Sequence, residues 1–104
     1  MGLDQDLVAD VRTALVGAGA IREVKMFGGI GFMLNGNMAV GVHGDELIVR
    51  IAPERTDEAL AKPHTRVFDM TGRPMQGWLL VDSEADLDAW IAEGAAYASS
   101  LPPK

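Results

Sequence analysis

Residues 25–38 read KMFGGIGFMLNGNM and carry the strongest local signals in this sequence. Asn35 and Gly36 both accept a positive φ, which is what the type I′ turn of a β-hairpin requires. The residues before the turn, 22–34, are strand-like: Val24 and Met26 alternate with Glu23 and Lys25, as in a strand with one buried face. This stretch therefore predicts a β-hairpin with a glycine-rich first strand.

Three glycines, Gly28, Gly29 and Gly31, lie inside that first strand. Glycine within a strand indicates a bulge or a close approach of another backbone. A dinucleotide-binding loop would need a third glycine where this chain has Leu34, and a helix would have to follow instead of a hairpin. We therefore expect the glycines to shape the backbone, and we expect no nucleotide or other cofactor.

The strand after the turn alternates again. Because successive side chains point to opposite faces, Met38, Val40 and Val42 should share one face, and Ala39 and Gly41 the other. A second tight turn at residues 44–45 leads to a third strand. The apolar face of that strand is formed by Leu47, Val49 and Ile51.

The rest of the chain predicts helices and two further strands. The expected helices cover residues 4–18, 53–62 and 84–99, and the expected strands cover residues 66–70 and 77–81. Asp4 is the predicted N-cap of the first helix, and Ser83 that of the last.

The resulting order of elements is α-β-β-β-α-β-β-α. Strands that follow one another through tight turns are antiparallel, so this order predicts a two-layer α+β fold. We expect a five-stranded antiparallel sheet with its helices on one face. The length of 104 residues is that of one domain, so a single domain over residues 1–104 is expected.

Composition excludes several kinds of chemistry. The chain has no cysteine, so disulfides, thiol catalysis and cysteine-based metal sites are excluded. His43, Asp45 and Glu46 are neighbours in sequence, but the turn and the strand after it explain them, and we expect no metal site. The serines form no G-x-S-x-G motif, so we predict a protein that is not an enzyme.

The charge of the chain is unevenly distributed. The net charge is -6, yet residues 22–81 hold seven basic and seven acidic side chains, so the excess lies in the terminal segments. Such a balance disfavours general nucleic-acid binding, although a local basic patch stays open as an alternative.

Residues 26–44 carry no charged side chain but include six glycines, so no membrane span is expected. No secretory signal is recognised, and a cytoplasmic location is expected.

Trp78 is the best single candidate for an interaction anchor. Alternation places Trp78 and Leu80 on one face of their strand and Leu79 and Val81 on the other. If helices cover one face of the sheet, an aromatic side chain on the other face marks an interface unless another segment covers it.

Three segments together resemble the TfoX (Sxy) N-terminal domain family. They are residues 25–38, residues 47–50, and Phe68 followed by residues 72–78. The resemblance implies an α+β fold of the secretion-chaperone type and a bacterial regulatory role in natural competence and transcriptional control. Regulators of this family often carry a second, helical domain, whereas we expect this chain of 104 residues to be a stand-alone, single-domain member. The resemblance implies no catalytic residues.

The motif positions divide into two groups. Backbone geometry explains the first, a structural set: Gly28, Gly29, Gly31, Asn35, Gly36, Gly72, Pro74 and Gly77. The second group is the candidate recognition surface: Lys25, Phe27, Arg73 and Trp78. The expected partner is a protein whose identity the residues do not name. Three alternatives stay open: local nucleic-acid binding, a small-ligand or enzymatic domain, and a homodimer joined through the glycine-rich strand as an edge.

Overall fold

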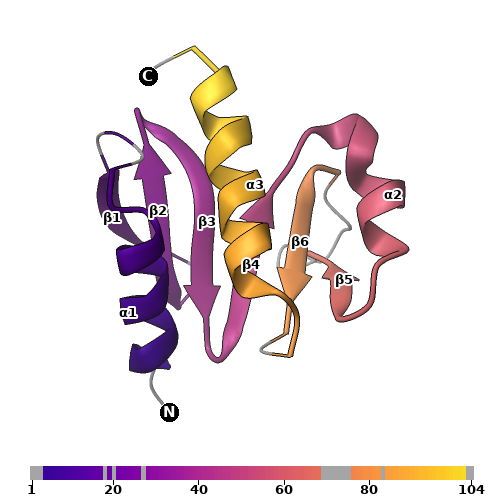
Figure 1. Cartoon of the computed structure of the whole chain (residues 1–104), viewed down its shortest axis with the longest axis horizontal. Coiled ribbons are helices and arrows are strands. Elements are labelled where there is room, and N and C mark those ends of the chain that lie inside the picture. The colour runs from indigo at the N-terminus through magenta and orange to yellow at the C-terminus, as the bar shows by residue number, and fades with distance from the viewer. Residues whose placement is uncertain are drawn as a thin grey trace.

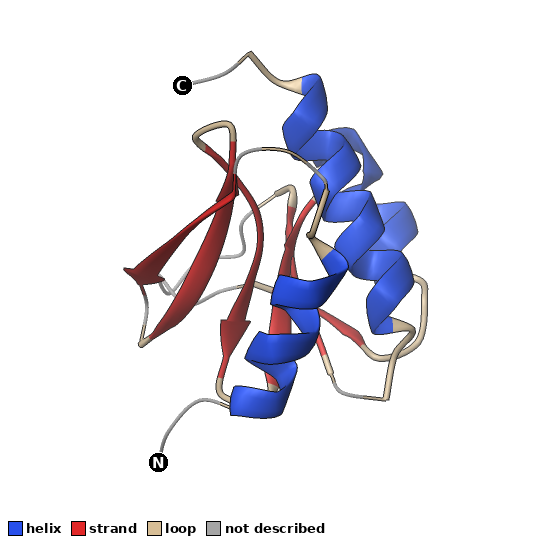
Figure 2. Ribbon diagram, turned by 60° about the vertical axis from the view of Figure 1, so that its left-hand side comes forward, coloured by secondary structure: helices blue, strands red, loops and turns tan. Residues whose placement is uncertain are grey.

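The chain folds into two layers, a sheet and the helices that lie on one of its faces (Figure 2). The structure is a computed structural model that describes residues 4–17, 19, 21–26, 28–68, 76–82 and 84–102. All strand pairs are antiparallel, and the sheet is open. The predicted α+β class, with helices on one face of an antiparallel sheet, is confirmed.

The sheet is a meander of four strands extended by two more (Figure 1). The meander consists of β1 (Ile21–Met26), β2 (Gly29–Leu34), β3 (Asn37–His43) and β4 (Glu46–Arg50). The two further strands are β5 (Thr65–Val67) and β6 (Trp78–Val81). Strand β6 pairs with β4, and β5 pairs with β6, so the order across the sheet is β1-β2-β3-β4-β6-β5.

The described sheet has six strands, one more than the sequence predicted. The difference arises at Gly28, whose φ of 74° turns the chain and divides the expected strand 22–34 into β1 and β2. Gly29 and Gly31 consequently lie in β2, between β1 and β3. The first half of the expected strand, β1, forms an edge of the sheet, and the glycine-rich second half, β2, does not.

The turns follow the predicted chemistry. Asn35 has a φ of 54° and Gly36 a φ of 86°, in agreement with a type I′ turn between β2 and β3. At Gly29 the backbones approach closely, because a Cβ atom built there would lie 2.0 Å from the carbonyl oxygen of Val42. Only glycine leaves room for β3 at this point.

A β-bulge separates the two ends of β3. Phe32 pairs with Val40, but the next residue of β2 pairs with Met38, so Ala39 is the extra residue. Ala39 packs with Ala98 of the last helix, whereas Met38 joins a cluster on the other side of the sheet. The prediction that Met38 shares a face with Val40 is wrong because the extra residue reverses the alternation.

The described helices are α1 (Gln5–Ala14), α2 (Thr56–Leu60), which follows the 3-10 turn η1 (Pro53–Arg55), and α3 (Leu87–Ser100). Asp4 caps α1 as predicted, and its carboxylate accepts a hydrogen bond from the Leu7 N–H at 3.1 Å. None of the helices in the described part of the chain is long and apolar enough to cross a membrane.

Helix α3 begins three residues later than expected. Its N-cap is Asp86, which accepts a hydrogen bond from the Ala89 N–H at 3.2 Å. The predicted cap, Ser83, lies outside the described residues. An aspartate carboxylate is a strong N-cap, and Asp86 provides it here.

The main core lies between the helices and the sheet. From the strands it includes Phe32, Val40, Val42, Leu47, Val49, Leu79 and Val81, and from the helices Leu7, Val8, Val11, Ala59, Trp90 and Ile91. A second cluster lies on the face of the sheet that no described helix covers. It consists of Met38, Ile48, Phe68 and Leu80, with Met33 and Trp78 packed against them. Hereafter this face is called the helix-free face.

Helix α3 rests on β3 at Gly94. A Cβ atom at Gly94 would lie 2.5 Å from the carbonyl oxygen of Ala39 and 2.7 Å from a methyl group of Val40. Real Cβ atoms do not come this close to backbone atoms, so the helix can lie at this distance only with glycine at this position.

Replacing Gly94 with alanine tests this contact. Alanine is favoured over glycine within helices by about 1 kcal/mol, so the substitution would stabilise an unobstructed helix. Here we expect a loss of about 1–3 kcal/mol in the free energy of unfolding, because the methyl group forces α3 away from β3. Urea denaturation of the Gly94→Ala variant measures this loss. Ala96→Gly, at an exposed position of the same helix, is the control and should lose about 1 kcal/mol. A more stable Gly94→Ala variant would show that the helix is not held this closely.

Candidate functional site

Trp78 is the first residue of β6 and lies half-buried on the helix-free face. Its ring is 6.0 Å from that of Phe68, centroid to centroid, with the ring planes tilted by 34°. Leu79, the next residue, belongs to the main core on the opposite face. The predicted alternation along this strand is therefore confirmed.

Arg50, at the end of β4, is the cross-strand neighbour of Trp78. Its guanidinium carbon lies 5.4 Å from the centre of the Trp78 ring and 5.7 Å from the centre of the Tyr97 ring on α3. These distances are those of cation–π interactions. Arg50, Trp78 and Tyr97 are called the aromatic–arginine cluster below.

Gly77 fixes Trp78 beside the end of β4. Its N–H donates a hydrogen bond to the hydroxyl of Thr56 at 2.7 Å, and its carbonyl accepts one from the Ile51 N–H at 2.8 Å. Its φ is 85°, and a Cβ atom would lie 3.0 Å from the carbonyl oxygen of Ile51. Glycine thus allows β6 to start directly against the chain that leaves β4.

The structure places the two described members of the candidate recognition surface, Lys25 and Trp78, apart. Lys25 is exposed on β1, and its cross-strand neighbour Ile30 packs against the main core under the helices. Trp78 lies on the other face, four strands away in the order of the sheet. Phe27 and Arg73 lie outside the described residues, as do Gly72 and Pro74 of the structural set. Lys25 and Trp78 therefore lie on opposite faces of the sheet.

The described basic residues do not converge on one face either. Arg66 forms an ion pair with Glu46 on the helix-free face, and Arg12 pairs with Glu23 at 2.7 Å on the helix side. Arg55 pairs with Glu58 at 2.9 Å and also with Glu93 of α3. Lys62 stands over the ring of Trp90, its nitrogen 5.1 Å from the ring centre. Three of these side chains are therefore paired with carboxylates, and the fourth lies over an aromatic ring.

Hydrogen bonding in these ion pairs shifts the pKa values of Arg12, Glu23 and Arg55. The Arg12 guanidinium lowers the pKa of Glu23 below its usual value, and Glu23 raises that of Arg12. The pKa of Arg55 is raised chiefly by its hydrogen bond with Glu58. Both pairs are near the surface, where solvent screening leaves an ion pair with little net effect on stability.

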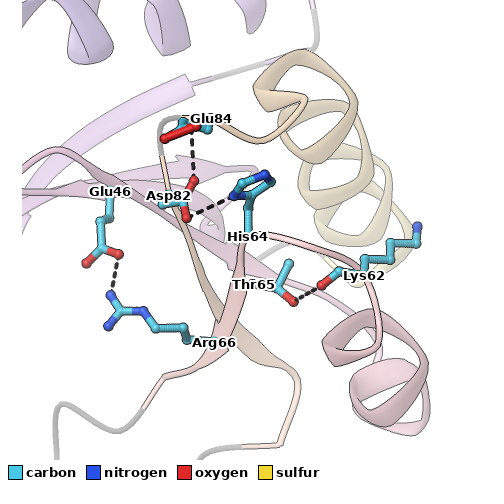
Figure 3. A network of polar contacts seen from close by, with 7 residues as sticks. All are labelled: Glu46, Lys62, His64, Thr65, Arg66, Asp82 and Glu84. Carbon is cyan, nitrogen blue, oxygen red and sulfur yellow. Dashed lines mark hydrogen bonds and ion pairs between the residues drawn. The ribbon is translucent and has the colours of Figure 1, made fainter.

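A polar network joins the start of β5 to the end of β6 (Figure 3). Asp82 accepts a hydrogen bond from the Glu84 N–H at 2.9 Å, and its other oxygen lies 3.2 Å from Nδ1 of His64. The backbone hydrogen bond is the largest cause of the lowered pKa of Asp82, followed by His64. His64 has a positive φ of 67°, and its carbonyl accepts the Asp82 N–H at 3.0 Å. The network therefore stabilises the junction of the two strands.

Two open grooves lie on the helix side. One, of about 660 Å³, runs between α1 and α3, with Leu7, Asp10, Asp88 and Ile91 among its lining residues. The other, of about 410 Å³, lies beside the Asp82 network. No group of three or more His, Asp or Glu residues in the described segments is arranged to hold a metal ion.

Sequence reasoning identified Trp78 but missed Arg50 and Tyr97. Arg50 lies on the face of β4 opposite to Leu47 and Val49. Charged residues in that position ordinarily face the solvent. Tyr97 lies 47 residues further along the chain, and no local spacing connects the two. The one signal in the sequence was the alternation along β4. It places Arg50 on the same face as Trp78, but only once β4 and β6 are known to pair.

The fold and the cluster define a class of protein: a small α+β domain with helices on one face of its sheet and an aromatic–arginine cluster at the end of β4, between Trp78 of the sheet and Tyr97 of α3. Comparison with protein families makes this more specific, because the model of the TfoX N-terminal domain matches residues 13–98. The chain therefore belongs to the TfoX N-terminal domain family, a family of regulatory, competence-associated domains, as the resemblance implied. No curated protein and no solved structure gives a significant match.

The charge of Asp82 should make the fold sensitive to acid. Because its pKa is lowered in the folded chain, its contribution to stability is present above the ordinary aspartate pKa of about 3.9 and is lost as the pH falls through the lower folded value. Asp82→Asn keeps an oxygen acceptor for the Glu84 N–H but removes the charge. We expect this variant to be less stable than the wild type at pH 7, with the difference shrinking below about pH 4.

Urea denaturation across this pH range measures the difference. Asp10→Asn, at an exposed position on α1, is the control and should not reproduce the pH dependence. An Asp82→Asn difference that stays the same at every pH would contradict the role given to the charge.

Proposed function

We propose that this protein is a non-catalytic regulatory domain of the bacterial cytoplasm that acts by binding a protein partner on its helix-free face. Membership of the TfoX N-terminal domain family supports the regulatory part of this proposal. The same family association suggests the control of competence or transcription as the setting in which the partner acts.

The aromatic–arginine cluster is the observation that carries the proposal. Trp78, Tyr97 and Arg50 are of the residue types most enriched among the dominant contacts of protein interfaces. Trp78 and Arg50 remain partly accessible, and Trp78 rests on the buried apolar cluster of Ile48 and Leu80. A firm apolar base beneath an accessible tryptophan is the arrangement of an interface anchor.

Nucleic-acid binding receives no comparable support. It requires basic residues gathered on one face, and the described ones are divided between the two sides of the sheet. Arg66 and Arg55 are also already paired with carboxylates. We therefore propose protein binding alone.

Site-specific photo-crosslinking in the native host tests the proposal. A photoreactive amino acid at Gln76, which is exposed two residues before Trp78, should form a covalent product with a partner. The same amino acid at Val16, an 80% exposed position near the end of α1, should not give that product. A product from position 16 and none from position 76 would contradict the choice of face, and none from either would contradict the proposed function.

Trp78→Ala in the position-76 background tests the anchor itself. Loss of a dominant interface residue costs about 2 kcal/mol or more, which corresponds to roughly 30-fold weaker binding. The cross-linked product should fall accordingly, while thermal melting verifies that the variant is folded. Trp78→Phe retains a ring against Phe68 and should restore part of the product. An unchanged yield from folded Trp78→Ala would refute Trp78 as the anchor.

A further inference from the structure

Arg50 has unused hydrogen-bonding capacity in a half-buried position. Within the described part of the chain, its guanidinium makes two ring contacts but no hydrogen bond and no ion pair. In contrast, Arg12, Arg55 and Arg66 each bind at least one carboxylate. A guanidinium carries five N–H donors, and partly removing it from water without a partner is unfavourable.

Ring contacts and oxyanion contacts use different parts of a guanidinium. Aromatic rings interact with its flat faces, whereas the N–H donors point outward in its plane. Trp78 and Tyr97 therefore hold Arg50 in place without using these donors. The result is a fixed, planar set of donors, which matches the two oxygens of a carboxylate.

The surroundings strengthen such an interaction. The neighbouring residues on the helix-free face are apolar and include Ile48, Leu80 and Phe68. A charge-assisted hydrogen bond is stronger next to apolar groups than in open water because the local dielectric constant is lower. An apolar residue adjacent to the incoming carboxylate would also find a complementary surface there.

The balance of charge favours a carboxylate over a phosphate. A carboxylate has one negative charge, which a single arginine neutralises, whereas a phosphate group at neutral pH carries more. The chain as a whole has a net charge of -6, which repels a dianion more strongly than a monoanion.

We infer that Arg50 binds the side-chain carboxylate of an aspartate or glutamate that lies between apolar residues of a protein partner. This inference rests on the proposed function, because it assigns the chemistry of the partner at the same site. Trp78 and the apolar cluster beneath it contact the residues that flank the carboxylate. Tyr97 keeps the guanidinium in position from the side of α3.

Titration of the full chain with short peptides tests the inference. The probe is acetyl-Leu-Glu-Leu-amide, and the matched control is acetyl-Leu-Gln-Leu-amide, which has the same shape and no charge. Nitrogen–proton NMR spectra follow the side-chain N–H groups of Arg50 and Trp78. We expect the glutamate peptide to shift both signals in a saturable manner and the glutamine peptide to bind at least about tenfold more weakly.

Variants of Arg50 identify the group responsible. Arg50→Gln should abolish the preference for the glutamate peptide, and Arg50→Lys, which keeps the charge but not the planar donors, should reduce binding. Arg22→Gln is the matched control, because Arg22 is an exposed arginine far away on β1 and should leave binding unchanged. Melting curves confirm that each variant is folded.

Three results would overturn the inference: equal binding of the two peptides, an Arg22→Gln loss as large as that of Arg50→Gln, or tighter binding of inorganic phosphate than of the glutamate peptide. A cross-linked partner that depends on Trp78 but not on Arg50 would also overturn it, while leaving the proposed function intact. Conversely, saturable binding of the glutamate peptide without any cross-linked partner would refute only the proposed function.

Discussion

The close contact between α3 and β3 at Gly94 is the constraint on which the rest of the structure depends. The helix lies so near the strand that a single methyl group at this position would meet the Ala39 carbonyl. One turn further along α3, Ala98 packs on Ala39 and Leu34, which keeps the second half of the helix against the sheet. Because the helix axis is fixed at these points, Tyr97 is carried to the end of β4, where it reaches Arg50. The contact thus builds the main core and also completes the candidate site.

The β-bulge at Ala39 gives the sheet its second buried cluster. The extra residue lets β3 direct Ala39 toward α3 and Met38 toward the helix-free face. Met38 then packs with Ile48 and Leu80, which form the base beside Trp78. Without the bulge, Met38 would lie under the helices, and the apolar cluster beside Trp78 would lack one of its members. The same local irregularity therefore serves packing on one side and the interaction surface on the other.

Local chemistry made much of the fold predictable. Asn35 and Gly36 specify their turn because few other residues adopt positive φ at low cost, and Asp4 specifies a helix start because its carboxylate accepts a backbone N–H. The extra strand was not predicted, because a glycine within a strand is compatible with a bulge, a close approach or a turn. At Gly28 it is a turn, and at Gly29 a close approach. The choice between these depends on which backbone lies nearby.

By itself, the sequence determined the class of the fold, the antiparallel meander, the alternation that separates Trp78 from Leu79, and membership of the TfoX N-terminal domain family. These features depend on local periodicity and turn geometry, which act over a few residues. The tertiary structure alone decided that Lys25 and Trp78 lie on opposite faces and that Arg50 and Tyr97 join Trp78. The physical reason is that strand pairing and helix packing bring together residues tens of positions apart, and no local spacing in the chain records which of them will meet.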